Sequence, residues 1–399
     1  LPLGVALSVS FVGRRGLNLY TGVEGNPVKP TNLVNGVLPP NTVAVYDAVK
    51  GGAPNNCLNN VIPVDPVTGI PQPFLVGGVA VTSADPHYPC RVNPYFGSAL
   101  FFTNAASSWY NSLQVNVSKH LGHGLMFQGA FTWSRSTDTS EGTRFNDDCG
   151  GPAQANFGHN PFNLALDYAP SCFDISKSVH FNLIYHLPGL SSNGFLSKVT
   201  NGWWVGNLVS VQGGNPFVPI VNNDRSFSGI VSQNPSSVVS LNTAAVTTAN
   251  GAFIPYDPAT VITGNPNQWY NPLMFGVPAL GRLGNAPRSI LRGPGLGTWD
   301  FSLVKDTKVG FLGEEGNIQF RAEVFNMLNR ANFGFMNAGM TAFNANTTLN
   351  TFTPTGGVAT PCPAGGASCN AFAPLSTAGQ ITQTSTTARQ IQLALRVSF

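Results

Sequence analysis

The sequence predicts an all-β protein, a transmembrane antiparallel β-barrel with short periplasmic turns and long extracellular loops. Three observations support it: alternating apolar and polar residues, scarce charge, and alternating short and long connections. Charged residues make up only 9% of the 399 residues, about a third of their share in soluble domains. No stretch approaches the roughly 18 consecutive apolar residues of a membrane helix. Strands that turn one face to lipid account for both features.

The last thirteen residues show the alternation most clearly. Every second side chain is apolar, as in a strand with one apolar and one polar face: Ile391, Leu393, Leu395, Val397 and Phe399. The same pattern predicts seven further strands, at residues 3–11, 108–119, 125–134, 177–187, 203–212, 299–309 and 318–327. Two residues break it: Leu208 falls on the polar face and Lys305 on the apolar one. A bulge or a lysine that extends to the membrane interface would explain these exceptions.

The connections between these strands alternate in length without exception. Three are short, at 120–124, 188–201 and 310–317. Four are long and rich in Gly, Pro, Asn, Ser and Thr, at 13–106, 135–176, 215–297 and 329–386. Outer-membrane barrels have short periplasmic turns and long extracellular loops. If the chain ends in the periplasm, all four long loops lie outside the cell.

The tryptophans gather at the predicted strand ends. Trp109, Trp133 and Trp299 fall at the outer ends, and Trp203 and Trp204 open a strand at its inner end. Aromatic rings with a polar edge favour the two membrane interfaces. Their placement therefore supports the barrel independently of the alternation.

The six cysteines all fall in the predicted long loops, as three local pairs: Cys57 with Cys90, Cys149 with Cys172, and Cys362 with Cys369. Loops exposed to an oxidising exterior favour disulfides, and the spacing lacks the Cys-x-x-Cys of metal sites. Unpaired thiols remain an alternative, above all for Cys57 and Cys90, which a long segment separates.

Several segments resemble the carboxy-terminal barrel of TonB-dependent outer-membrane receptors of the Oar-like group, which often carry a carboxypeptidase-regulatory-like domain. The similar segments are SFVGRRG at 10–16, WYNSLQV at 109–115, GLMFQGAFTWS at 124–134, PGLGTWDFSL at 294–303, QFRAEVFNMLN at 319–329 and NFG at 332–334. The resemblance implies a barrel of about 22 strands. Residues 1–399 would form its carboxy-terminal part, without the signal sequence, the regulatory-like domain, the plug and the earlier strands.

The resemblance also implies a function and partners. The barrel would take up a scarce or bulky nutrient, such as a siderophore, a glycan or a peptide, with energy from a TonB complex that contacts the missing amino-terminal region. Phe399 would be the signal recognised by the barrel-assembly machinery, and outer-membrane lipid would surround the wall. The alternative is a barrel for adhesion or surface-protein handling without active transport. The net charge of +3 is too small to indicate a nucleic-acid partner.

Polar residues at inward positions of the strands are the candidate lumen-facing side chains: Gln128, Asn182, Arg321, Glu323, Gln392 and Arg396. An ion in mid-strand must point inward, because a charge on the lipid face costs about 2–4 kcal/mol at the midplane. Arg321 and Glu323 then either contact a plug or solute, or form a wall charge paired with a neighbouring strand; we favour the second interpretation.

The sequence predicts neither an enzyme nor a cofactor or metal site. It lacks the Gly-x-Ser-x-Gly, phosphate-loop and His-Glu-x-x-His motifs. His120 with His123, and His180 with His186, have no acidic or cysteine partner nearby in sequence, so solvated histidines are favoured over zinc ligands. Asp147 and Asp148 could bind calcium, but no regular spacing of further acids follows them.

Overall fold

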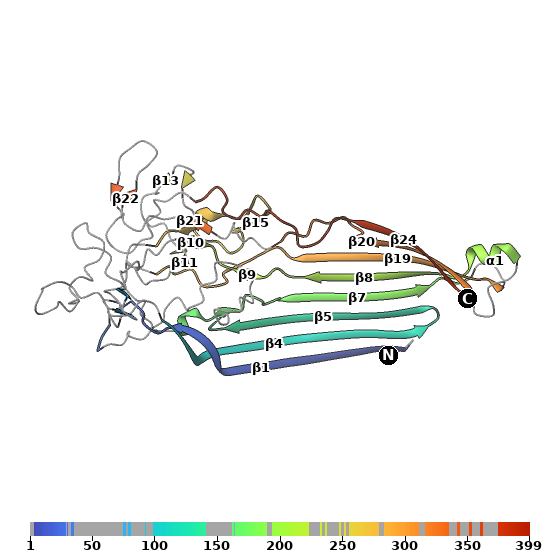
Figure 1. Ribbon diagram of the computed structural model, residues 1–399, viewed down its shortest axis with the longest axis horizontal. Coiled ribbons are helices and arrows are strands. Elements are labelled where there is room, and N and C mark those ends of the chain that lie inside the picture. The colour runs from blue at the N-terminus through green and yellow to red at the C-terminus, as the bar shows by residue number, and fades with distance from the viewer. Residues whose placement is uncertain are drawn as a thin grey trace, which may run out of the picture.

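The computed structural model describes residues 4–28, 30, 33–35, 75–76, 79–80, 92, 99–140, 162, 164–189, 194–222, 232–233, 236–237, 247–248, 251–252, 255–278, 283–310, 316–334, 341–343, 351–352, 360–361 and 374–399. One large antiparallel sheet dominates it (Figure 1). Eight long strands follow one another in the sheet in chain order: β1 (Val5–Glu24), β4 (Leu100–Gly122), β5 (Leu125–Asp138), β7 (Lys177–His186), β8 (Trp203–Gln212), β19 (Leu296–Lys308), β20 (Asn317–Phe325) and β24 (Gln390–Ser398). The short β6 (Ala169–Pro170) pairs with β5.

The eight predicted strands are confirmed, and their order is that of an up-and-down wall in which each strand pairs with its chain neighbours. The shortest have nine residues, the length needed by a tilted membrane strand. The sheet is not closed: within the described residues, β1 and β24 each pair on one side only.

Some predicted boundaries were wrong at the ends of the long connections. β1 continues to Glu24 and β4 begins at Leu100, so their ladder covers both edges of the predicted loop 13–106. β5 likewise continues to Asp138. A ladder can extend past the membrane, where water on both faces no longer requires the alternation that predicted it. The short connection at 188–201 contains a helix, α1 (Gly194–Thr200), that the alternation did not predict.

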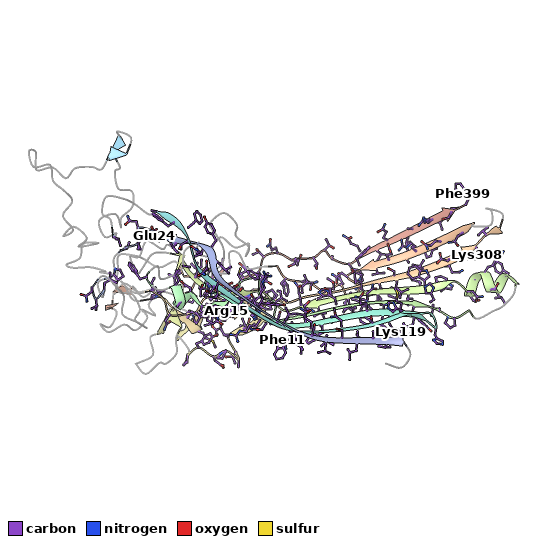
Figure 2. The ribbon with its side chains drawn as sticks, turned by 90° about the horizontal axis from the view of Figure 1, so that it is seen from below. Phe11, Arg15, Glu24, Lys119, Lys308 and Phe399 are labelled. Atoms are coloured by element: carbon purple, nitrogen blue, oxygen red, sulfur yellow. The ribbon has the colours of Figure 1, made fainter. Side chains whose placement is uncertain are left out.

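The two ends of the sheet differ as the connection lengths predict. Figure 1 shows both chain termini and α1 at one end, and the short strands of the long connections at the other. We call these the turn end and the loop end. Figure 2 places Lys119, Lys308 and Phe399 at the turn end and Glu24 at the loop end. At the tight turn between β4 and β5, His123 (φ 55°) and Gly124 (φ 77°) adopt the left-handed conformation of a two-residue hairpin.

The register places the predicted apolar side chains on one continuous face. Phe127 pairs with Leu183, and Phe131 with Val179, across β5 and β7. At the far edge, Phe320 pairs with Leu395. This face is not covered by protein: within the described chain, the exposed large apolar side chains include Leu7, Val9, Phe11, Trp133, Val179, Val211, Phe320, Ile391, Leu393, Leu395 and Val397. An apolar surface of this extent indicates contact with lipid.

Neither break in the alternation is a bulge, because the register of β8 and β19 runs without a shift. Leu208 lies on the polar face between Asn182 and Asp300. Lys305 lies on the apolar face near the turn end, where its amino group donates to the carbonyl of Asp306 and the hydroxyl of Thr307, both at 3.0 Å. This is the geometry of a lysine that extends toward the interface.

Beyond the loop end, segments of two long connections, 215–297 and 329–386, pack into a separate apolar core. Its fully buried side chains include Phe217, Val221, Tyr270 and Phe275. Short strands pair within these two connections: β9 (Pro216–Phe217) with β18 (Leu291–Arg292), β10 (Ile220–Asn222) with β11 (Ser232–Gln233) and β21 (Thr341–Phe343), β12 (Ser236–Ser237) with β17 (Phe275–Gly276), β13 (Thr247–Thr248) with β14 (Gly251–Ala252), β15 (Ile262–Asn265) with β16 (Gln268–Tyr270), and β22 (Thr351–Phe352) with β23 (Thr360–Pro361). In connection 13–106, β2 (Leu75–Val76) pairs with β3 (Val79–Ala80). Within the described residues, no helix is long and apolar enough to cross a membrane.

The two faces can be tested by placing single cysteines at neighbouring positions, in a protein whose native cysteines are replaced. Cysteines at Leu183 and Leu393 should react with a lipid-soluble maleimide, and cysteines at Asn182 and Gln392 with a water-soluble one. The reason is that adjacent strand residues point to opposite faces. Mass spectrometry measures the labelled fraction, and labelling without a two-residue period would contradict the architecture.

Deletion of Phe399 should lower the amount of protein in the outer membrane severalfold. The side chain is 93% exposed, so lost packing cannot account for such an effect, whereas failed assembly can. Phe399→Tyr keeps the aromatic ring and serves as the control, with a wild-type level expected. Immunoblots of separated membranes measure both variants; equal levels for the deletion and the wild type would refute the assembly role of the terminal ring.

Candidate functional site

The polar face of the sheet is the first part of the candidate site. All six predicted lumen-facing residues lie on it, in two groups separated by β8 and β19. On β5 and β7, Gln128 and Asn182 are direct cross-strand partners. On β20 and β24, Glu323 pairs with Gln392, Arg321 pairs with Ala394, and Arg396 pairs with Gln319. The structure therefore brings Arg321, Glu323, Gln392 and Arg396 together, and Gln128 and Asn182 lie apart from them on the far side of β8 and β19.

Arg321 and Glu323 form an ion pair with each other. Their charged atoms lie 3.2 Å apart, on side chains that are 40% and 21% exposed. The partner is thus two residues along the same strand, rather than on a neighbouring strand as the favoured interpretation had it. Partly exposed pairs of this kind contribute up to about 1 kcal/mol.

The sequence analysis missed a cluster of hydrogen bonds around the Asp306 carboxylate, near the turn end. Asp306 accepts hydrogen bonds from the indole of Trp204 at 2.9 Å, the amide of Gln319 at 2.9 Å and the amide of Asn317 at 3.2 Å. All three donors are neutral, and they come from β8 and β20 on either side of Asp306. The cluster joins β8, β19 and β20 on the polar face, at the predicted periplasmic end of the barrel. Its only signal in the sequence is a charge next to Lys305.

Two histidines of the polar face, His180 and His186, have different neighbours. The two ring nitrogens of His180 lie 2.9 Å from the hydroxyl of Ser178 and 3.0 Å from that of Ser210. His186 packs near the ring of Trp204, with centroids 5.8 Å apart. Across the part of the chain that the structure describes, no three His, Cys, Asp or Glu side chains gather as a metal site would require.

Two arginines, Arg288 in a turn and Arg292 in β18, join the loop core to the strand ends, and we call them the arginine clamp. The guanidinium of Arg288 donates to the carboxylate of Asp138 at 2.5 Å and to the carbonyl of Asp167 at 3.1 Å. Arg292 forms an ion pair with Asp174 and donates to the carbonyl of Gly214 at 3.2 Å. The clamp thus connects the loop ends of β5, β7 and β8.

Three of the four side chains in the two ion pairs of the clamp are almost completely buried. Arg288 and Asp138 are 7% and 6% exposed, and Asp174 is 1% exposed. Asp174 also accepts a hydrogen bond from the backbone N–H of Ser136 at 2.6 Å. Its carboxylate thus replaces the backbone acceptor that a neighbouring strand would supply, at a point on β5 beyond the end of its ladder with β7. Sequence alone gave no signal for these residues beyond the rarity of charge.

Cys172 lies between β6 and the clamp residue Asp174. It is buried and disulfide-bonded. The other five cysteines and the Asp147–Asp148 pair lie outside the described residues. The pairings Cys149–Cys172, Cys362–Cys369 and Cys57–Cys90 therefore stay predictions.

Three groups in and beside the loop core have shifted pKa values. Burial raises the pKa of the Tyr270 phenol, and burial together with the charge of Asp257 raises the pKa of Tyr256. The backbone N–H of Ala259 and the hydroxyl of Thr260 donate to Asp257 at 2.9 and 2.8 Å and lower its pKa. All three shifts follow from burial and from the local structure of the turn at Asp257.

An antiparallel wall with an exposed apolar face, a polar face and unequal connections defines the class of membrane-spanning β-barrels. Comparison with protein families agrees: the model of the outer membrane beta barrel domain matches residues 1–392. The chain therefore belongs to this family and is an integral protein of the outer membrane, with long extracellular loops and short periplasmic turns. Searches of curated proteins and of solved structures found no match.

Arg288→Met should destabilise the extracellular loop core by about 3–5 kcal/mol, because it leaves the buried Asp138 carboxylate without its ion-pair partner. Urea unfolding followed by loop proteolysis in detergent measures the change. Arg321→Gln, which breaks the more exposed pair, is the control and should cost no more than about 1 kcal/mol. Equal effects of the two substitutions would show that the clamp does not hold the loops.

Proposed function

We propose that the protein is the wall of a TonB-dependent receptor of the Oar-like group, which takes up a scarce or bulky nutrient with energy from the inner membrane. The observation that carries this proposal is the polar face, whose side chains could meet a plug or a passing solute. It has hydrogen-bonding groups from β5 to β24, and a clamped loop core lies at its extracellular end.

The open sheet supports a larger barrel. Within the described residues, β1 and β24 each have one edge without a partner strand. Such an edge would leave backbone groups exposed to hydrocarbon, each at a cost of several kcal/mol. We therefore propose that further strands close the wall around an interior wide enough for a plug. The partners would be the barrel-assembly machinery, the TonB complex and an extracellular solute, with no nucleic acid, no cofactor and no catalytic activity.

Uptake by cells that produce the full-length protein tests the transport proposal. Three probes represent the candidate cargo classes: a radiolabelled ferric siderophore, a fluorescent maltooligosaccharide and a fluorescent peptide. Accumulation of one of them should exceed that of cells without the protein and should fall to their level when an uncoupler removes the proton gradient, because a TonB complex depends on that gradient.

The outcome also separates the alternative function. Binding of a probe that an uncoupler leaves unchanged would contradict energy-coupled uptake and favour adhesion or surface-protein handling. Arg321→Gln is a useful variant, because loss of uptake with unchanged surface binding would place the wall charge on the route of the solute. Unchanged uptake in this variant would make the charge a structural pair.

A further inference from the structure

Basic side chains follow the extracellular edge of the lipid-facing band. Arg135 is the next outward residue after Trp133 on β5, and Lys177 is the next after Val179 on β7. On β1, Arg15 lies two outward positions beyond Phe11, toward the loop end (Figure 2). All three cations are exposed.

A fourth cation reaches the same edge from the segment after β20. One terminal nitrogen of Arg330 lies 2.7 Å from the place where a Cβ on Gly297 would stand, next to Val211 of the apolar face. We call Arg15, Arg135, Lys177 and Arg330 the outer cation belt. On the neighbouring strands β5 and β7, Arg135 and Lys177 directly follow the outermost apolar residues Trp133 and Val179, so this part of the belt lies at the membrane surface. Arg15 lies on β1, which β4 separates from β5.

No acid of the described chain neutralises this belt. The ion pairs of the described residues involve Arg288, Arg292 and Arg321. The carboxylates of Asp138, Asp300, Asp306 and Glu323 alternate onto the polar face, opposite the belt. The only ring contact of the belt is Arg15 over Trp109, at 5.6 Å. Its exposed N–H donors are therefore available to a group outside the wall.

Cations at the periplasmic edge of the same face behave differently. The amino group of Lys119 donates to the carbonyl of Gly122 at 3.2 Å, and Lys305 has two acceptors within the protein. Lys119 and Lys305 are therefore satisfied internally, whereas the extracellular cations of this face are available for an anion. This difference between the two edges matches a membrane with distinct leaflets.

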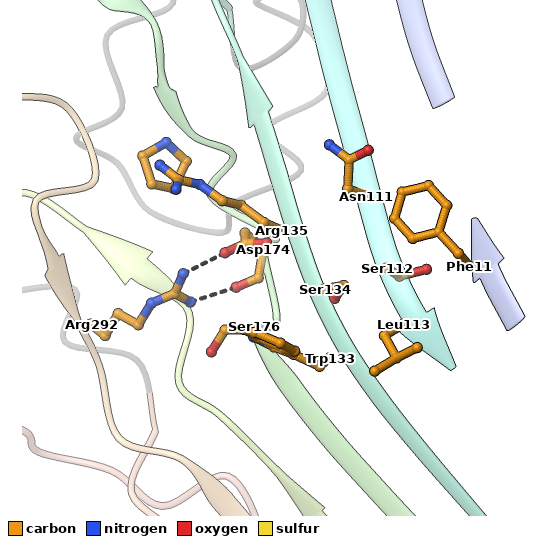
Figure 3. A pocket seen from close by; sticks show the side chains of 11 residues that line it. Phe11, Asn111, Ser112, Leu113, Trp133, Ser134, Arg135, Asp174, Ser176 and Arg292 are labelled. Atoms are coloured by element: carbon orange, nitrogen blue, oxygen red, sulfur yellow. Dashed lines mark hydrogen bonds and ion pairs between the residues drawn. The ribbon is translucent and has the colours of Figure 1, made fainter. Parts of the chain in front are cut away.

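A hollow lies directly against the belt. Its volume is about 630 Å³, and Phe11, Leu113 and Trp133 line it together with Asn111 and Arg135 (Figure 3). Asp174 also borders the hollow, but its charge is paired with Arg292. The hollow offers apolar surface below and a guanidinium above, the combination that an acylated, phosphorylated lipid would need.

We propose that the outer cation belt and this hollow bind a phosphorylated glycolipid of the outer leaflet, of the lipid A type, with its phosphates on Arg15, Arg135 and Lys177 and an acyl chain against Phe11 and Trp133. The site is independent of any cargo in the barrel. Arginine suits it because its planar donors fit phosphate oxygens.

Native mass spectrometry of the full-length protein, titrated with bisphosphorylated lipid A in detergent, tests this proposal. Arg15→Gln and Arg135→Gln should each weaken binding about fivefold, and the combination with Lys177→Gln about a hundredfold, because each basic residue at a charged membrane surface contributes that much. Lys119→Gln is the matched control, on the same face at the opposite edge, and should bind as the wild type. Retained heat-modifiable migration on gels verifies folding of each variant.

Four results with the variants and lipids would overturn the proposal, as would a fifth with inorganic phosphate. They are wild-type affinity in the triple variant, an equal loss in Lys119→Gln, equal binding of lipid A without phosphates, and equal binding of phosphatidylglycerol, which would indicate only general attraction of anions. Inorganic phosphate should not displace the lipid at matched concentration; complete displacement would assign the belt to free phosphate instead.

Discussion

The fold depends on one constraint: backbone N–H and C=O groups in hydrocarbon must all be paired within the protein. The ladder meets it between neighbouring strands of the wall, and its irregularities fall outside the apolar band. Register shifts occur beyond Gly16 of β1 and between Lys119 and Gly122 of β4, whereas the pairs from β5 to β24 within the large sheet have none. An unshifted ladder keeps the two-residue period, and the period keeps the two faces chemically distinct.

The same constraint distributes the charges. Lipid excludes ions from the middle of the outward face, so the carboxylates of the strands lie on the polar face and the outward cations lie at the two edges of the band. Above the membrane the limit disappears, and the two clamp arginines hold the loop core through ion pairs with buried carboxylates. Arg288 and Arg292 reach Asp138 and Asp174 across more than a hundred residues of sequence, which makes the loops part of the wall.

Sequence predicted the features that local pattern determines. The alternation at Leu393 and Leu395, or at Phe181 and Leu183, follows from lipid on one face, and the register agrees with it. The extension of β1 to Glu24 was missed because water surrounds that part of the ladder on both sides. The bonds of Trp204 to Asp306 and of Arg288 to Asp138 were missed because they depend on the register of distant segments, which no local pattern encodes.

The two faces differ in how strictly they select residues. Leu208 stands on the polar face with 52% of its surface exposed, and nothing compensates it, because an apolar group beside polar ones costs little. Asn207, on the apolar face, is treated differently: its side-chain oxygen accepts the indole N–H of Trp299 at 3.0 Å. A polar group can lie within the band only when a partner lies there too, since lipid offers none. Lipid therefore determines the outward residues far more strictly than the interior determines the inward ones, which leaves the polar face free to vary with the solute or plug it meets.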